Sequence, residues 1–237
     1  MGLLWDIFCH KTRRPRGDVL RSTKVYDLGR SFWIAYFKIF HGFKLRGQHN
    51  IPDHGPVIFA PNHTSYYDPP VAGMCVPYQI RYMAMEELFR WKPLASLILA
   101  HGAYPVKLKS ADKGAVATTL KILKNKEALM IFPEGGRSAS YDLMPFEQGL
   151  ARLMLQVGGT IVPTSIVGVY EAWSRHEPLP LWFHPIIVKF HTPIIVPRIE
   201  DRGELKERID DLNEQIARPI RRRIKAWLRL KQRLDVP

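Results

Sequence analysis

A histidine and an aspartate lie five positions apart in residues 61–68, PNHTSYYD, as His63 and Asp68. A neutral imidazole is a good general base near pH 7 because its ordinary pKa is ~6.5. A carboxylate bonded to the other ring nitrogen fixes the tautomer and stabilises the imidazolium that forms. An ideal helix would place side chains five residues apart roughly 140° from each other, so a joint role requires a turn. The spacing alone also fits an unrelated loop histidine beside an aspartate that caps a helix.

The flanking residues predict the turn that this pair needs. Residues 57–60 are four consecutive apolar residues after Gly55 and Pro56, which indicates a buried strand. Pro69 and Pro70 favour the first turn of a helix, with Asp68 near its N-cap. We therefore expect His63 to follow the carboxyl end of a strand, where open α/β sheets bind their ligands.

Three sequence blocks resemble the glycerolipid acyltransferases, the family of 1-acylglycerol-3-phosphate acyltransferases. The segment NHTSYYD resembles their NHxSxxD signature, and residues 132–138, FPEGGRS, resemble their FPEGTRS block with Gly136 at the threonine position. Residues 161–166, IVPTSI, are similar to their late VIPVAI strand. All three stand in the order and spacing of that family, and the resemblance runs from about residue 47 to residue 191.

The resemblance implies transfer of a fatty acyl group from an acyl thioester to the free hydroxyl of a lysophospholipid. The favoured acceptor is 1-acylglycerol-3-phosphate, which would give phosphatidic acid in phospholipid biosynthesis. His63 would take the proton of the attacking hydroxyl, and Asp68 would orient His63. The expected donor is acyl-CoA or the acyl carrier protein thioester, with no other cofactor. No metal is expected, because two ligands fall short of the three that a catalytic metal typically needs.

The second block is expected to bind the phosphate of the acceptor. Gly135 and Gly136 would let backbone N–H groups approach an oxyanion, and Arg137 offers a bidentate fork. Glu134 is carried over from the family as a substrate-site residue, and we expect it to hold Arg137.

One departure from the family's pattern leaves the acceptor open. The family commonly has GxxPVxR between these blocks, whereas residues 102–108 read GAYPVKL, so Leu108 replaces the arginine. Lys107 or Lys109 would substitute, although lysine lacks the planar fork of arginine. Another lysophospholipid or a different hydroxylated lipid is therefore an alternative acceptor. The sequence sets neither the acyl-chain length nor the oligomeric state.

The alternation of apolar segments with helical patterns predicts an α/β fold, a mixed, largely parallel sheet flanked by helices. The expected strands are residues 57–60, 80–85, 103–106, 128–132, 161–170 and 186–190, and the expected helices are residues 69–76, 87–100, 111–124 and 148–157. In the third helix, Val116, Leu120 and Leu123 are expected to share one buried face.

The two ends of the chain predict membrane contact. The formal charge is +13, from 35 basic and 22 acidic residues, which implies an acidic partner. Residues 1–46 divide into a basic arm and an aromatic helix over 32–43, which lies in a membrane interface or covers the core. Residues 201–237 form a basic amphipathic helix, broken or restarted at Pro219, which suits an anionic membrane surface or solvent.

These patterns give three segments: residues 1–46, a catalytic domain over 47–200, and the helix over 201–237. We expect a peripheral or monotopic protein at the cytoplasmic face of a membrane, because no stretch reaches the ~20 apolar residues of a spanning helix and no signal peptide is evident. Nucleic acid is not an expected partner, since no zinc spacing or helix-turn-helix accompanies the charge. A lipid-binding protein without turnover and a thioester hydrolase are further alternatives.

Overall fold

The computed structural model describes residues 23–53, 55–107 and 113–234. An eight-stranded sheet forms its centre. The strands are β1 (Lys44–Arg46), β2 (Val57–Pro61), β3 (Arg81–Met85), β4 (Ala103–Val106), β5 (Ala128–Met130), β6 (Gly159–Val167), β7 (Ile187–Phe190) and β8 (Ile194–Val196).

The strand order is β1-β7-β6-β2-β5-β3-β4, and β8 pairs with β6. All neighbouring strands are parallel except in two pairs, in which β6 is antiparallel to β7 and to β8. From β2 the chain continues to β3, β4 and β5 on one side before it crosses to β6 on the other side. The carboxyl end of β2, which His63 follows, is therefore the switch point of the sheet, the usual ligand-binding position in this class.

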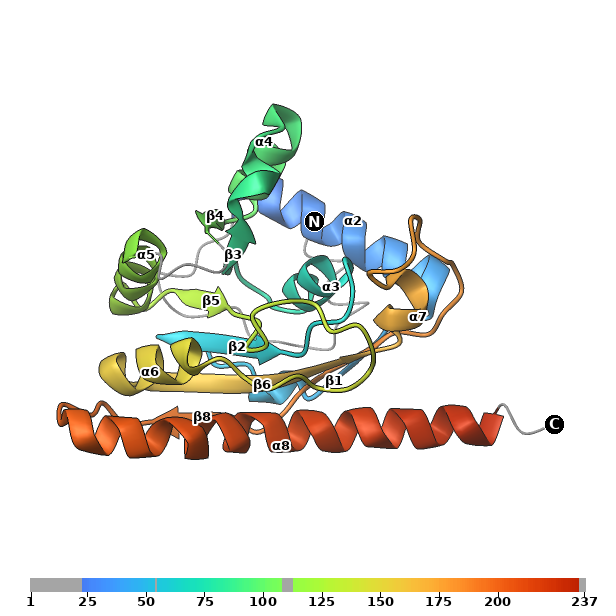
Figure 1. Cartoon of the computed structure of the whole chain (residues 1–237). Coiled ribbons are helices and arrows are strands. Elements are labelled where there is room, and N and C mark those ends of the chain that lie inside the picture. The colour runs from blue at the N-terminus through green and yellow to red at the C-terminus, as the bar shows by residue number, and fades with distance from the viewer. Residues whose placement is uncertain (1–22, 54, 108–112, 235–237) are drawn as a thin grey trace.

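Helices cover both faces of the sheet (Figure 1). Side chains of α2 (Lys24–His41), α3 (Asp68–Met74) and α7 (Val169–Trp173) pack into one core. Side chains of α5 (Lys113–Lys124), α6 (Gln148–Val157) and α8 (Arg202–Leu234) pack into the other core. Between β3 and β4, α4 (Lys92–Ala100) follows a 3-10 turn (Glu86–Phe89), has no buried residue and rises away from the sheet (Figure 1).

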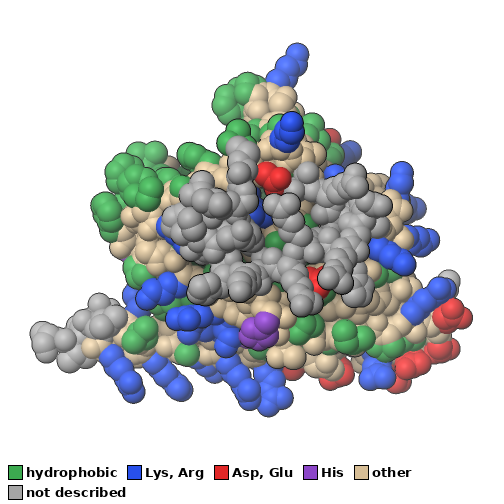
Figure 2. Space-filling view, turned by 180° about the vertical axis from the view of Figure 1, so that it is seen from behind, with side chains coloured by type: hydrophobic (Ala, Val, Ile, Leu, Met, Phe, Trp, Pro, Cys, Tyr) green, Lys and Arg blue, Asp and Glu red, His purple; other side chains and the backbone are tan. Residues whose placement is uncertain are grey.

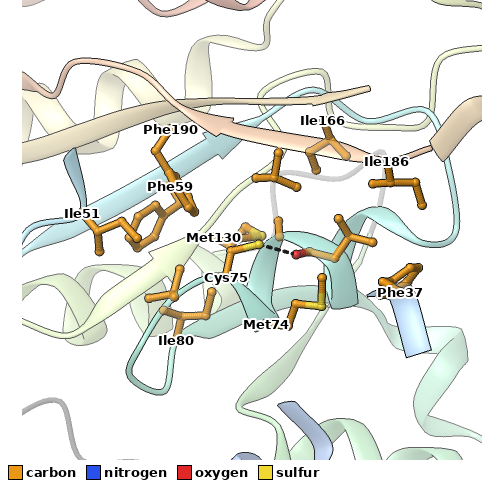
Figure 3. Close-up of a cluster of buried hydrophobic side chains, with 14 of the residues drawn as sticks. Phe37, Ile51, Phe59, Met74, Cys75, Ile80, Met130, Ile166, Ile186 and Phe190 are labelled. Carbon is orange, nitrogen blue, oxygen red and sulfur yellow. Dashed lines mark hydrogen bonds between the residues drawn. The ribbon is translucent and has the colours of Figure 1, made fainter. Parts of the chain in front are cut away.

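The central strand β2 shows why both faces must be covered. All five of its residues are buried, and residues 57–60 alternate between the two cores. Val57 and Phe59 face the α2–α3 side, where Phe59 meets Phe190 of β7 with ring centroids 5.6 Å apart (Figure 3). Ile58 and Ala60 face the α6–α8 side. A strand buried on both faces has a continuous apolar sequence, as residues 57–60 do.

Several predicted boundaries are wrong. The first described helix starts at Lys24, not at residue 32, because the Thr23 hydroxyl caps it by accepting the backbone N–H of Tyr26 at 3.2 Å. Strands β1 and β8, of three residues each, are too short for a sequence period and were not predicted. In α5 the buried face includes Thr119 and Ile122, whereas Val116 is exposed. Most of the expected basic arm, residues 1–22, lies outside the described residues.

The C-terminal helix continues through Pro219, contrary to the expected break. Its apolar stripe is buried over its whole length, at Leu205, Ile209, Leu212, Ile216, Ile220, Ile224 and Trp227. This stripe belongs to the core shared with α6 and β6. An interior proline costs a helix about 3 kcal/mol, and burial of several large side chains at roughly 1.5–3 kcal/mol each outweighs that cost.

The described helices of both terminal segments, α2 and α8, therefore pack onto the sheet of the predicted catalytic domain. The aromatic helix α2 buries Ile34 and Phe37 in the core, while Phe32 and Ile39 remain exposed. The basic side chains of α8 line the lower edge of the molecule in Figure 2. None of the helices in the described ranges is long and apolar enough to cross a bilayer.

Candidate active site

The histidine and the aspartate singled out by the sequence are in contact. Nδ1 of His63 donates to Oδ2 of Asp68 at 2.8 Å, and Asp68 is fully buried. Because the carboxylate accepts at Nδ1, the neutral ring carries its proton there and Nε2 is left as an acceptor. The His63 side chain retains 17% of its exposure, so Nε2 can reach a substrate. This is the arrangement that a general base requires.

The turn between the two residues is built around the same carboxylate oxygen. Oδ2 of Asp68 also accepts the backbone N–H groups of Thr64 and Ser65, at 2.6 and 2.7 Å. Asp68 is the first residue of α3 rather than its cap, because its side chain reaches back to this turn instead of forward into the helix. The two backbone bonds fix the carboxylate, and the carboxylate then fixes the imidazole.

Glu134 supports the histidine from the second sequence block. Its Oε1 accepts the backbone N–H of His63 at 2.7 Å, and its Oε2 accepts the N–H of Met144 at 2.9 Å. Both oxygens are therefore engaged by backbone groups, and Glu134 positions the histidine rather than holding Arg137 as expected. Burial raises the pKa of Glu134 to about 7, against the opposing effect of its two backbone bonds.

The same block contacts His63 at two further points. The His63 ring stacks on Phe132, with centroids 4.0 Å apart and planes at 21°. The carbonyl of His63 accepts the backbone N–H of Ser138 at 2.8 Å. Together with the Glu134 hydrogen bond, these contacts hold His63, which follows β2, against the segment that follows β5. The two strands are adjacent and parallel, so both segments leave the same edge of the sheet.

The glycines and the arginine form a turn beside the pair. Gly135 has φ +67°, a left-handed conformation that favours glycine, and its N–H closes the turn onto the carbonyl of Phe132 at 3.1 Å. A Cβ on Gly136 would meet nothing within 4 Å, which explains how this position holds threonine in the family's pattern. The Arg137 guanidinium lies 3.7 Å from the centroid of the Tyr66 ring. Nη1 of Arg137 is buried and has no hydrogen-bond partner among the described residues.

Lys107 does not join this cluster. It follows β4 at the same edge of the sheet, but β5 and β3 separate β4 from β2. Three strand spacings of ~4.8 Å place it roughly 14 Å from the end of β2. Leu108, where the family's second arginine is expected, lies outside the described residues.

Sequence reasoning missed two features of the site. Asn62 makes a two-way bond with the backbone of Ile166, donating from Nδ2 at 2.9 Å and accepting at Oδ1 at 2.8 Å, which ties the end of β2 to β6. The second feature is the turn over residues 174–177, whose Ser174 pairs with Ser65. Asn62 belongs to the first block, so its presence near the site could have been predicted. The turn lies more than a hundred residues further along the chain and contains no recognisable motif.

A cavity of about 530 Å³ lies near this turn, between α7 and the C-terminal part of α8. Its lining includes Tyr141, Tyr170, Ser174 and Lys231, but not His63. Because Ser174 pairs with Ser65, the cavity adjoins the turn between His63 and Asp68 without containing either residue. No group of three potential metal ligands occurs within the described ranges.

Comparison with known proteins agrees with the sequence blocks. The family model Acyltransferase matches residues 42–167. A Bacillus subtilis 1-acyl-sn-glycerol-3-phosphate acyltransferase is 30% identical over 128 residues, covering 54% of this chain and 63% of the relative. Human 1-acyl-sn-glycerol-3-phosphate acyltransferase alpha is 26% identical over 173 residues, covering 68% and 58%. The chain thus matches less than two thirds of the length of these relatives.

A solved structure shares the fold. The crystal structure of the 1-acyl-sn-glycerophosphate (LPA) acyltransferase PlsC from Thermotoga maritima matches with a TM-score of 0.67 at 22% identity. The match covers 86% of this chain and 78% of that chain. Because the family model spans more than half of the 237 residues and includes both blocks of the site, this chain belongs to the acyltransferase family.

Proposed function

We propose that this chain transfers a fatty acyl group from an acyl thioester to the free hydroxyl of 1-acylglycerol-3-phosphate, forming phosphatidic acid. The observation that carries the proposal is the His63–Asp68 bond, with Nε2 left as acceptor and Arg137 nearby with an unpartnered N–H. The names of the relatives support this acceptor. A buried, unsatisfied guanidinium donor favours an anionic group such as phosphate.

The proposed reaction needs one base and no covalent enzyme intermediate. Nε2 of His63 takes the hydroxyl proton as the acceptor oxygen attacks the thioester carbonyl. Asp68 stabilises the imidazolium. The tetrahedral intermediate then expels the thiolate, which receives the same proton from His63. Ser65 is fully buried and donates to the carbonyl of Trp173 at 2.6 Å, so it does not serve as a nucleophile.

The donor in this proposal is acyl-CoA or the acyl carrier protein thioester, and no further cofactor is needed. Both donors have the same leaving group, a phosphopantetheine thiol, so the chemistry at His63 is the same for each.

We further propose that the protein binds a membrane through the side that carries α2 and α4. Exposed apolar side chains on that side include Leu28, Phe32 and Ile39 of α2 and Leu97 and Leu99 of α4. Residues 179–183 extend this apolar surface, because the rings of Trp182 and Phe183 contact Phe40 of α2. The cytoplasmic face of an anionic membrane suits a lipid acceptor and a water-soluble thioester donor.

This proposal revises the expected role of α8. Its apolar stripe is buried against the sheet, and α8 lies on the face opposite α2 (Figure 1). A flat membrane that meets the apolar side of α2 and α4 therefore does not also receive α8 along its length. The basic face of α8 remains available for other acidic surfaces.

The test is acyl transfer by purified protein in mixed micelles, from labelled acyl-CoA to 1-acylglycerol-3-phosphate, beside His63→Ala. We expect phosphatidic acid from the wild type and a loss of at least a hundredfold in the variant, since a positioned base contributes ~10²–10⁴-fold. Product only from another hydroxylated lipid would replace the acceptor. Thioester loss without any acceptor would indicate a hydrolase. Folded protein that binds lipid but forms no product with either donor would support a lipid-binding protein without turnover.

A further inference from the structure

The turn over residues 174–177 is fixed against both blocks of the site. Ser65 pairs with Ser174 in an antiparallel bridge, and the Ser65 hydroxyl donates to the carbonyl of Trp173 at 2.6 Å. On the other side, His176 Nε2 and the carbonyl of Ala139 lie 3.3 Å apart. These contacts join a segment outside the residues matched by the family model to the first block and to Ala139, which follows the second block.

This turn places a second arginine beside Arg137. Nη1 of Arg175 donates to the backbone carbonyl of Arg137 at 3.1 Å. A guanidinium has five N–H groups, and no other hydrogen bond of Arg175 is found within the described ranges. Arg175 is exposed. Glu177 on the same turn forms no ion pair with Arg175 in the described part of the chain.

The charge of the proposed acceptor calls for more than one cation. A phosphate monoester carries about −1.5 to −2 charges at pH 7, whereas Arg137 supplies one positive charge. The position of the family's second arginine is occupied by Leu108. Lys107 is separated from β2 by two strands. Arg175, in contrast, is hydrogen-bonded to the backbone carbonyl of Arg137.

We propose that Arg175 is a second phosphate-binding residue of the acceptor site and a determinant of acceptor specificity. Its guanidinium lies at the backbone carbonyl of Arg137, on a segment that is bonded to the turn between His63 and Asp68. This inference rests on the proposed function, because it concerns the phosphate of the same acceptor. The competing explanation is structural: Arg175 would only hold the Arg137 backbone in place.

Steady-state kinetics with two acceptors separate these explanations. The acceptors are 1-acylglycerol-3-phosphate and 1-acylglycerol, which differ only in the phosphate. The variants are Arg175→Ala, Arg175→Lys and the control Arg152→Ala, which removes an exposed arginine of α6 whose Nη2 donates to Gln148. A hydrogen bond between charged groups contributes roughly tenfold to a hundredfold in affinity.

We expect Arg175→Ala to raise the KM for the phosphate-bearing acceptor about tenfold or more. Its kcat, its KM for the donor and its rate with 1-acylglycerol should stay near wild-type values. Arg175→Lys should recover part of the loss because it keeps the charge, and Arg152→Ala should behave as wild type. An equal loss with both acceptors, or no loss with either, would overturn the role in phosphate binding.

A binding measurement tests the role of Arg175 independently of whether the proposed reaction occurs. Calorimetric titration of short-chain 1-acylglycerol-3-phosphate, below its micelle concentration and without donor, requires no turnover. We expect Arg175→Ala to bind it about tenfold more weakly than the wild type and Arg152→Ala to bind it equally. Weaker binding by Arg175→Ala in a protein that forms no phosphatidic acid would support the inference while the proposed function fails. Unchanged binding would overturn the inference even if the reaction occurs.

Discussion

Oδ2 of Asp68 accepts the Nδ1 proton of His63 at 2.8 Å, and the same oxygen accepts two backbone N–H groups of the intervening turn. One buried atom therefore sets both the shape of the turn and the orientation of the ring. This arrangement explains how a spacing that no regular helix satisfies still brings the two side chains together.

Replacement of the Asp68 carboxylate by an amide should separate its role in positioning His63 from the effect of its negative charge. In Asp68→Asn the side-chain oxygen can still accept hydrogen bonds from the turn, but the negative charge that stabilises the imidazolium is lost. We expect kcat to fall by about a hundredfold or more, with a KM for the acceptor close to that of the wild type. The measurement is the micelle assay at pH 7.5, with circular dichroism to verify folding. A kcat within threefold of the wild type would contradict the role of the charge.

The buried carboxyl of Glu134 should make stability depend on pH. Burial raises its pKa from 4.5 to about 7, so the folded state binds more protons than the unfolded state between these values. The free energy of unfolding should therefore decrease as pH rises through this interval, by up to ~3 kcal/mol, since one pKa unit corresponds to about 1.4 kcal/mol. Urea unfolding at pH 5 and pH 8 measures this decrease.

Two variants isolate the contribution of Glu134. Glu134→Gln stays neutral at both pH values and should lose less stability than the wild type between pH 5 and pH 8. Glu177→Gln, at an exposed position, should keep the wild-type difference. The same pH difference in the wild type and Glu134→Gln would show that another group carries it.

The C-terminal helix should behave as part of the core. Ile216 is fully buried in the cluster shared with the sheet, whereas Leu230 on the same helix is 48% exposed. Ile216→Ala should lower the free energy of unfolding by about 2–5 kcal/mol, and Leu230→Ala by at most ~0.5 kcal/mol. Urea denaturation monitored by tryptophan fluorescence tests both. Equal effects would mean that α8 does not pack on the sheet in solution.

Membrane binding should depend on the side that carries α2 and α4. Ile39 is 69% exposed and Trp91, which precedes α4, is 66% exposed. Ile39→Glu and Trp91→Glu should each reduce sedimentation with phosphatidylglycerol vesicles, because a carboxylate is costly to bury in the acyl-chain region. Leu230→Glu, on the opposite side, is the matched control and should sediment as the wild type does. Loss of binding in Leu230→Glu alone would place α8 on the membrane instead.

Much of the fold follows from local sequence. The apolar run of β2, the α6 helix and β4 were predicted from period and composition, because each of these segments agrees locally with its final environment. The contact between His63 and Asp68 was also predicted, from the strand, turn and proline signals around the two residues and from the resemblance of NHTSYYD to the family's signature. The short strands β1 and β8 gave no such signal, since their pairing depends on partners far away in the chain.

By itself, the sequence determined the α/β class, the pairing of His63 with Asp68, and the block that contains Arg137. Only the tertiary structure decided how these parts are supported. It assigned Glu134 to the His63 backbone, buried the stripe of α8 despite Pro219, and brought Arg175 to Arg137 across 38 positions of the chain. The physical reason is that each of these contacts joins segments that meet only when the sheet assembles, so no local period or motif specifies them.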